Sequence, residues 1–163
     1  MSCAYLAFTE RGLALAQQLA AACPGPVARC GAGGPGLDEW TAAQFAASDA
    51  LIYIGAVGIA VRAIAPHCRS KAVDPAVVVL DECGRFAVPL LSGHLGGANA
   101  LARRLAAECG AVPVITTATD LHGLFAVDEW AKRQGCIVAE PERIKQVSGA
   151  LLAGKRVHFT ADW

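Results

Sequence analysis

Short apolar runs alternate with amphipathic stretches along most of this chain. The runs are rich in Ala, Val, Ile and Leu and are bounded by glycine, proline or polar residues, which is typical of strands buried on both faces. We expect strands at residues 3–8, 27–30, 50–54, 76–80, 85–91 and 112–115. Apolar residues spaced three and four apart predict helices after most of these runs, at residues 13–23, 41–48, 58–65 and 100–109.

This alternation predicts an α/β fold, a three-layer α/β/α domain with a mostly parallel sheet. The turn at residues 81–84 separates two apolar runs closely, so we expect one β-hairpin and one antiparallel strand. Ligands bind beyond the carboxyl ends of the strands in such sheets. Three segments rich in glycine or polar residues follow strands, namely residues 55–62, 92–99 and 116–120. We expect them to converge on one edge of the sheet.

The pattern changes after residue 123. Helices are predicted at residues 127–134 and 141–152, with short extended segments at 136–139 and 155–160. The organisation of the chain therefore changes near this point.

Composition and charge narrow the function classes. Hydrophobic residues make up 55% and mean hydropathy is +0.42, but no apolar run reaches the roughly 20 residues that span a bilayer, so we expect no membrane partner. Fourteen basic and fourteen acidic side chains give zero net charge, which argues against nucleic acid as a partner. The seven cysteines form no C-x-x-C pair, which favours reduced thiols over disulfides or zinc. With no secretion signal after Met1, we expect a cytoplasmic protein.

The segment at residues 92–99 is the centre of the predicted site. It joins an apolar strand to a helix through Gly93, Gly96 and Gly97. Glycines let the backbone approach a ligand closely, and a helix N-terminus attracts negative charge.

Three polar residues of this segment are candidate catalytic groups. His94 is the best candidate for a general base, because a helix N-terminus favours the neutral imidazole; capping or packing is the alternative. Ser92 is an N-cap, a ligand contact or, less well supported without a G-x-S-x-G motif, a nucleophile. Asn99 is either a donor to an oxyanion or a surface amide.

The segment at residues 116–120 offers a second set of polar groups. Asp120 is the second acid–base candidate, and Thr116, Thr117 and Thr119 place hydroxyl donors beside it. Threonines at a strand end are otherwise explained by β-propensity.

Further candidates are expected to contact the substrate. Gly55 and Gly58 form a glycine turn too short for a dinucleotide fingerprint. Arg62 and Lys71 can pair with ligand carboxylates, but a solvated face or an ion pair with Asp74 explains them equally well.

Two other patterns predict less. The adjacent His67 and Cys68 lack two further metal ligands at suitable spacing, so we predict no metal site. The glycine-rich residues 31–36 lack the Gly-Lys-Ser/Thr ending of a phosphate loop and are interpreted as a surface connector.

Four motifs together resemble the cobalamin biosynthesis protein CbiG family, the cobalt-precorrin-5A hydrolases, most densely over residues 50–130. They are Gly55-Ala56-Val57-Gly58-Ile59-Ala60-Val61-Arg62, Lys71-x-x-Asp74-Pro75-Ala76-Val77-Val78-Val79, Pro89-Leu90-Leu91-Ser92-Gly93-His94-x-Gly96-Gly97-Ala98-Asn99 and Pro113-Val114-Ile115-Thr116-Thr117-Ala118-Thr119-Asp120.

The resemblance implies a hydrolase that opens the δ-lactone of a cobalt-tetrapyrrole with water and releases acetaldehyde. It implies no cofactor, because cobalt is carried by the substrate. His94 or Asp120 would be the base, with N–H groups around Gly96 and Gly97 and the hydroxyls of Thr116 and Thr117 stabilising the oxyanion.

The resemblance also implies the domain organisation: an N-terminal α/β domain at residues 1–136 and the beginning of the family's middle region at residues 137–163. We expect the family's C-terminal domain to be missing from this sequence, and a homodimer is a further expectation. Two alternatives stay open at this stage. One is a non-catalytic module that binds a corrinoid intermediate of the same pathway. The other is a nucleotide- or phosphate-binding α/β protein, which is disfavoured by the absence of a Walker motif and of a full G-x-G-x-x-G.

Overall fold

The structure, a computed structural model, describes residues 1–31 and 33–160. It divides into a first compact unit, Met1–Val114, and a second unit that begins at Ile115. No helix of the described residues is long and apolar enough to cross a membrane.

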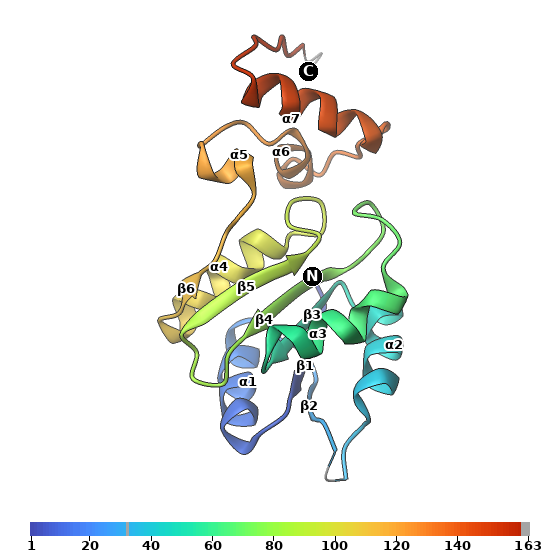
Figure 1. Ribbon diagram of the computed structural model, residues 1–163, viewed down its shortest axis with the longest axis vertical. Helices are drawn as coiled ribbons and strands as arrows, with labels where there is room; N and C mark the ends of the chain where they lie inside the picture. The colour runs from blue at the N-terminus through green and yellow to red at the C-terminus, as the bar shows by residue number, and fades with distance from the viewer. Residues whose placement is uncertain (32, 161–163) are drawn as a thin grey trace. The chain divides into compact units, whose positions relative to one another are not determined.

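The first unit contains a six-stranded sheet in the order β2-β1-β3-β4-β5-β6. All neighbouring strands are parallel except β4 and β5, which form an antiparallel pair (Figure 1). The predicted mostly parallel sheet with one hairpin is therefore confirmed. The strands are β1 (Cys3–Ala7), β2 (Val27–Arg29), β3 (Ala50–Ile54), β4 (Ala76–Leu80), β5 (Phe86–Leu91) and β6 (Val112–Pro113).

Helices cover both faces of this sheet, as expected for three layers. Helices α2 (Leu37–Ala47) and α3 (Val57–Ile64) pack on one face, and a short 3-10 helix, η1 (Ala65–His67), follows α3. Helices α1 (Glu10–Ala22) and α4 (Ala98–Cys109) contact each other and cover the opposite face (Figure 1).

The alternation of side chains along the strands explains the two-sided core. Toward α2 and α3, every second strand residue joins one apolar cluster, which includes Ala4, Leu6, Leu51, Tyr53, Val77 and Val79. Two buried tyrosines keep their hydroxyls bonded. Tyr5 donates to the Cys23 carbonyl at 2.6 Å, and Tyr53 bonds Thr41 at 2.8 Å. Burial raises the pKa of Tyr53 to about 12, although the bond to Thr41 opposes this change.

The antiparallel strand places two of the predicted site segments at opposite edges of the sheet. Ile54, the end of β3, pairs with Leu80, the end of β4, so residues 55–62 begin at the carboxyl edge of these strands. Strand β5 runs the other way, and its last residue, Leu91, pairs with Val77 at the amino end of β4. Residues 92–99 therefore begin at the amino edge. The expectation that these two segments converge is wrong, and a five-residue strand, about 17 Å long, separates them.

The second unit is helical. It contains α5 (Ala118–Leu121), α6 (Val127–Arg133), the 3-10 helix η2 (Pro141–Arg143) and α7 (Ile144–Leu152). The extended segments predicted at residues 136–139 and 155–160 do not form strands in the described part of the chain. A strand needs a neighbour to satisfy its backbone N–H and C=O groups, and every strand of the described residues belongs to the sheet of the first unit.

The compact units meet between Val114 and Ile115, whereas the predicted domains meet between residues 136 and 137. The physical reason for the earlier division is β6, the last strand, which ends at Pro113 and completes the sheet. Residues 161–163, which end the second predicted domain, lie outside the described residues.

Candidate functional site

Residues 92–99, hereafter the Ser92 loop, leave β5 through a left-handed backbone conformation. Ser92 has φ 56°, a region that residues with a Cβ rarely adopt. Ser92 is only 8% exposed, and its hydroxyl donates to the carbonyl of Asp74 at 3.0 Å. The Ser92 hydroxyl thus ties the loop to the segment that precedes β4. Ser92 is not the N-cap of α4, because Gly97 occupies that position, and its roles as a ligand contact or a nucleophile stay predictions.

The glycines of the loop are required by close packing. A Cβ on Gly96 would lie 2.3 Å from the Cβ of Ser92, and a Cβ on Gly93 would lie 2.9 Å from the amide oxygen of Asn99. The Asn99 side chain is therefore turned inward against the loop, with 3% of the residue exposed. The surface-amide alternative for Asn99 is wrong, while its role as an oxyanion donor stays a prediction.

The backbone donors at the beginning of α4 are used within the loop. The N–H of Gly97 donates to the His94 carbonyl at 3.0 Å, that of Ala98 to the Ser92 carbonyl at 3.1 Å, and that of Asn99 to the Gly93 carbonyl at 2.9 Å. These bonds satisfy groups that a helix N-terminus otherwise presents to a ligand. A role for the Gly97 N–H in binding an oxyanion therefore requires its bond to His94 to open.

The loop that precedes β4 lies beside the Ser92 loop at the amino edge. Asp74 is 7% exposed, and its carboxylate accepts the Arg69 N–H at 2.9 and 3.1 Å. Within the described residues Asp74 makes no ion pair with Lys71, which is exposed. The sequence predicted Asp74 only as an ion-pair partner. It did not predict that the Asp74 carboxylate holds the backbone of this loop. The Asp-Pro dipeptide at the beginning of a strand was the available signal.

Residues 55–62 begin at the carboxyl edge of β3, where close packing explains why residue 55 is a glycine. A Cβ on Gly55 would lie 2.6 Å from the ring of Phe8. Gly58 and Arg62 lie on α3, are exposed, and are near each other, with an Arg62 nitrogen 4.0 Å from the Cβ position of Gly58. A cavity of about 330 Å³ lies at this edge, lined by Phe8, Thr9, Ile54, Gly55, Ala56, Ile59, Asp81 and Glu82.

Asp81 in this cavity wall organises the hairpin turn. Its carboxylate accepts the N–H groups of Cys83, Arg85 and Phe86 at 2.8 to 2.9 Å. Burial raises the pKa of Asp81, but the backbone donors outweigh burial and hold the pKa below its usual value. The Asp81 carboxylate is therefore committed to the turn.

Residues 116–120 belong to the second unit. Thr117 precedes α5, and its hydroxyl donates to the Asp120 carboxylate at 2.5 Å, so the structure brings this predicted pair together. Thr119 is buried and Thr116 is exposed. A donated hydroxyl favours the charged form of a carboxylate. The Thr117 hydroxyl is thus engaged with Asp120 here, and the roles of these residues in catalysis stay predictions.

Comparison with known proteins identifies two segments. The family model described as "Cobalamin synthesis G N-terminal" matches residues 39–120, and "Cobalamin biosynthesis central region" matches residues 125–163. The first match covers half of the chain and includes all four motifs. The chain belongs to the CbiG family. Consistent with this membership, the central-region match lies within the second compact unit.

Two curated relatives of the chain share one name. The chain is 48% identical over 119 residues to "Cobalt-precorrin-5A hydrolase" of Salmonella typhimurium, covering 72% of this chain and 34% of the relative. It is 45% identical over 102 residues to the protein of the same name from Priestia megaterium, covering 63% of this chain and 27% of the relative. The matched part of the chain thus spans 34% and 27% of the length of these two relatives.

A solved structure supports the fold. The crystal structure of a cobalamin biosynthesis protein G homolog from Sulfolobus solfataricus matches with a TM-score of 0.58 at 23% identity, over 99% of this chain and 50% of that one.

Proposed function

We propose that this chain is the N-terminal and central part of a cobalt-precorrin-5A hydrolase of anaerobic cobalamin biosynthesis. The observation that carries the proposal is the 48% identity over 119 residues to a relative of that name. The order of the two family segments along the chain supports it.

In the proposed reaction, water opens the δ-lactone of a cobalt-tetrapyrrole, and the extruded carbon leaves with its methyl group as acetaldehyde, which gives cobalt-precorrin-5B. The cobalt belongs to the substrate, and we propose no cofactor. His94 or Asp120 takes a proton from the attacking water. Because the two belong to different compact units, each is tested by itself.

The sheet edges decide which cation we favour as a substrate contact. Lys71 lies in the loop whose Asp74 is bonded to Ser92, so it shares the amino edge with the Ser92 loop. Gly55, Gly58 and Arg62 belong to the other edge. We therefore propose that Lys71, rather than Arg62, pairs with a substrate carboxylate near His94.

Acetaldehyde release from cobalt-precorrin-5A tests the function, with this chain and with a chain of the relatives' full length. His94→Ala and Asp120→Asn are compared with His122→Ala and Asp38→Asn, which alter exposed residues. Loss of a general base lowers kcat roughly 10²- to 10⁴-fold. Normal release by both site variants would refute the assignment of the base.

The same assay separates the alternative of a non-catalytic binding module. In that case the chain binds the cobalt-tetrapyrrole, as detected by a change in its absorbance spectrum, and the full-length chain releases no acetaldehyde. All seven cysteines are unpaired thiols, which supports our proposal of a cytoplasmic location. The homodimer stays a prediction that light scattering tests.

A further inference from the structure

A second cavity lies at the amino edge of the sheet, within the first unit. Its volume is about 390 Å³, within the range of roughly 300–1,000 Å³ that small-molecule sites occupy. Helix α2 contributes Phe45 and Ala46 to its lining, and the segment between α3 and β4 contributes His67, Arg69 and Asp74. None of these residues belongs to the predicted catalytic set.

Asp74 connects this cavity to the Ser92 loop. Asp74 lines the cavity, and its carbonyl accepts the hydroxyl of Ser92 at 3.0 Å. Its carboxylate is held by the N–H of Arg69 on both oxygens. Asp74 is therefore a positioning residue that fixes the backbone of Arg69 beside the loop that carries His94.

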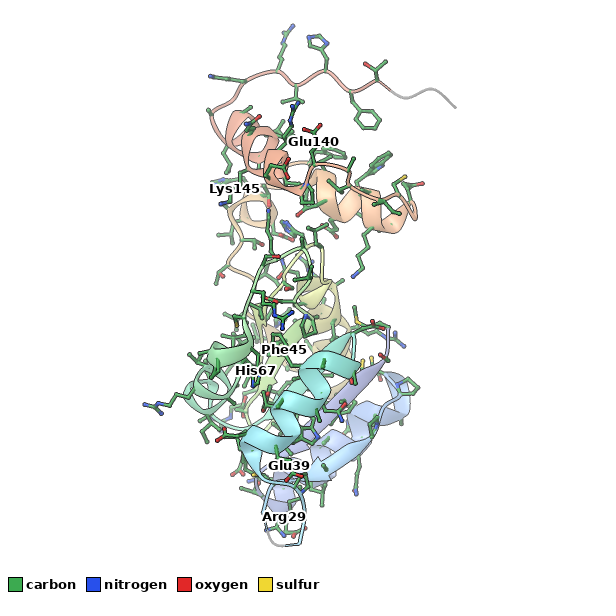
Figure 2. The ribbon with its side chains drawn as sticks, turned by 90° about the vertical axis from the view of Figure 1, so that its right-hand side faces the viewer. Arg29, Glu39, Phe45, His67, Glu140 and Lys145 are labelled. Atoms are coloured by element: carbon green, nitrogen blue, oxygen red, sulfur yellow. The ribbon has the colours of Figure 1, made fainter. Side chains whose placement is uncertain are left out.

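Cationic and aromatic groups meet at this cavity. His67 and Arg69, on either side of Cys68 in the chain, both line the cavity. The rings of Phe45 and His67 have centroids 5.6 Å apart, and Figure 2 shows these two labelled residues close together. The arrangement combines an always-charged guanidinium with an apolar aromatic wall.

We infer that this cavity binds a carboxylate-bearing side arm of the ring-shaped substrate, with Arg69 and His67 on the carboxylate and Phe45 against the methylene groups. This inference rests on the proposed function, because the tetrapyrrole supplies such arms. An apolar wall beside a guanidinium suits an acetate or propionate arm, whose methylenes and carboxylate differ in polarity.

Binding of two cobalt corrinoids to this chain tests the site. One probe is cobyrinic acid, whose side arms are free carboxylates, and the other is cobinamide, whose arms are amidated. Arg69→Gln is expected to weaken cobyrinic acid binding about tenfold or more, since a charge-assisted hydrogen bond is lost, and to leave cobinamide binding unchanged. Arg85→Gln, an exposed arginine of the hairpin, is the matched control.

A second pair of variants blocks the cavity without altering a charge. Ala46 lines the cavity and Ala43 does not, although both are exposed on α2. Ala46→Phe is expected to weaken cobyrinic acid binding, whereas Ala43→Phe leaves it unchanged. Both alanines are exposed, so both variants should fold, and circular dichroism checks this.

The inference is overturned if Arg69→Gln and Ala46→Phe bind cobyrinic acid as the unaltered chain does, or if the unaltered chain does not bind it. The acetaldehyde assay is independent of this result. Arg69-dependent binding without acetaldehyde release by the full-length chain would sink the proposed reaction and leave the carboxylate site standing. If the full-length chain releases acetaldehyde and Arg69→Gln does not change its KM, the proposed reaction stands and the carboxylate site is refuted.

Discussion

Two glycines of one motif, Gly55 and Gly58, serve different purposes. A Cβ on Gly55 would lie 2.6 Å from the Phe8 ring, while on Gly58 its nearest neighbour would be the flexible end of Arg62 at 4.0 Å. Gly55→Ala is expected to lower the free energy of unfolding by about 1–3 kcal/mol through overpacking. Gly58→Ala, within α3, should raise it by about 0.5 kcal/mol. Urea unfolding of both variants measures the difference, and an equal effect would contradict this account.

Ser92 combines a stabilising bond with an unfavourable backbone conformation. Ser92→Ala removes the bond to the Asp74 carbonyl and keeps the left-handed φ, so we expect a loss of about 1–2 kcal/mol. Ser92→Gly also loses the bond but relieves roughly 1 kcal/mol of backbone strain, so its net loss is smaller. Thermal unfolding of the two variants ranks them. If Ser92→Ala is more stable than Ser92→Gly, the left-handed backbone conformation does not determine the difference in stability between the two variants.

At the scale of elements, the β4–β5 turn carries a pH dependence. The pKa of Asp81 is lowered in the folded chain, so its contribution to stability is present above the ordinary pKa and is lost as pH falls through the lowered value. The unaltered chain is expected to lose stability between pH 5 and pH 2 more steeply than Asp81→Asn, as measured by urea unfolding across about pH 2–7. Parallel pH profiles would exclude Asp81 as the cause.

The central strands were well predicted because a strand that is buried on both faces requires a continuous run of apolar residues. The runs at residues 50–54 and 76–80 match β3 and β4. The segment at residues 155–160 alternates apolar Val157 and Phe159 with polar residues but forms no strand, because a pattern does not supply a pairing partner. Predicting which segments pair requires contacts between residues far apart in the sequence.

The candidate site was predicted less well, and the reason is the direction of one strand. The hairpin was predicted, but the position of the loop that follows it was not. Because β5 is antiparallel to β4, Leu91 and the Ser92 loop lie at the amino end of β4. The inward turn of Asn99 and the bonded N–H of Gly97 depend on loop geometry that residue types do not reveal. The sequence predicted that the Thr117 hydroxyl lies beside Asp120, because the two are close in the chain, but it did not predict the bond between them.

At the scale of the whole molecule, the division at Val114 predicts an independently folding unit. All six strands and the helices that cover them lie within Met1–Val114. A polypeptide ending at Val114 is expected to unfold cooperatively, with a Tm within a few degrees of the longer chain. Trp40 is the only tryptophan in that piece and is 7% exposed, so its emission reports folding. Emission typical of exposed tryptophan would contradict the division.

The reversal of β5 also bears on the order in which the chain folds. To pair β4 with β5, Leu80 need only meet Ala87 across a short turn, whereas β1 and β3 require Cys3 to meet Ala50. Closing a short loop loses less entropy and happens sooner. The hairpin, and with it the strand that leads into the Ser92 loop, is expected to form early. Gly84→Ala, at φ 65°, should therefore slow refolding in stopped-flow experiments more than it speeds unfolding. If Gly84→Ala speeds unfolding more than it slows refolding, the hairpin forms late in folding.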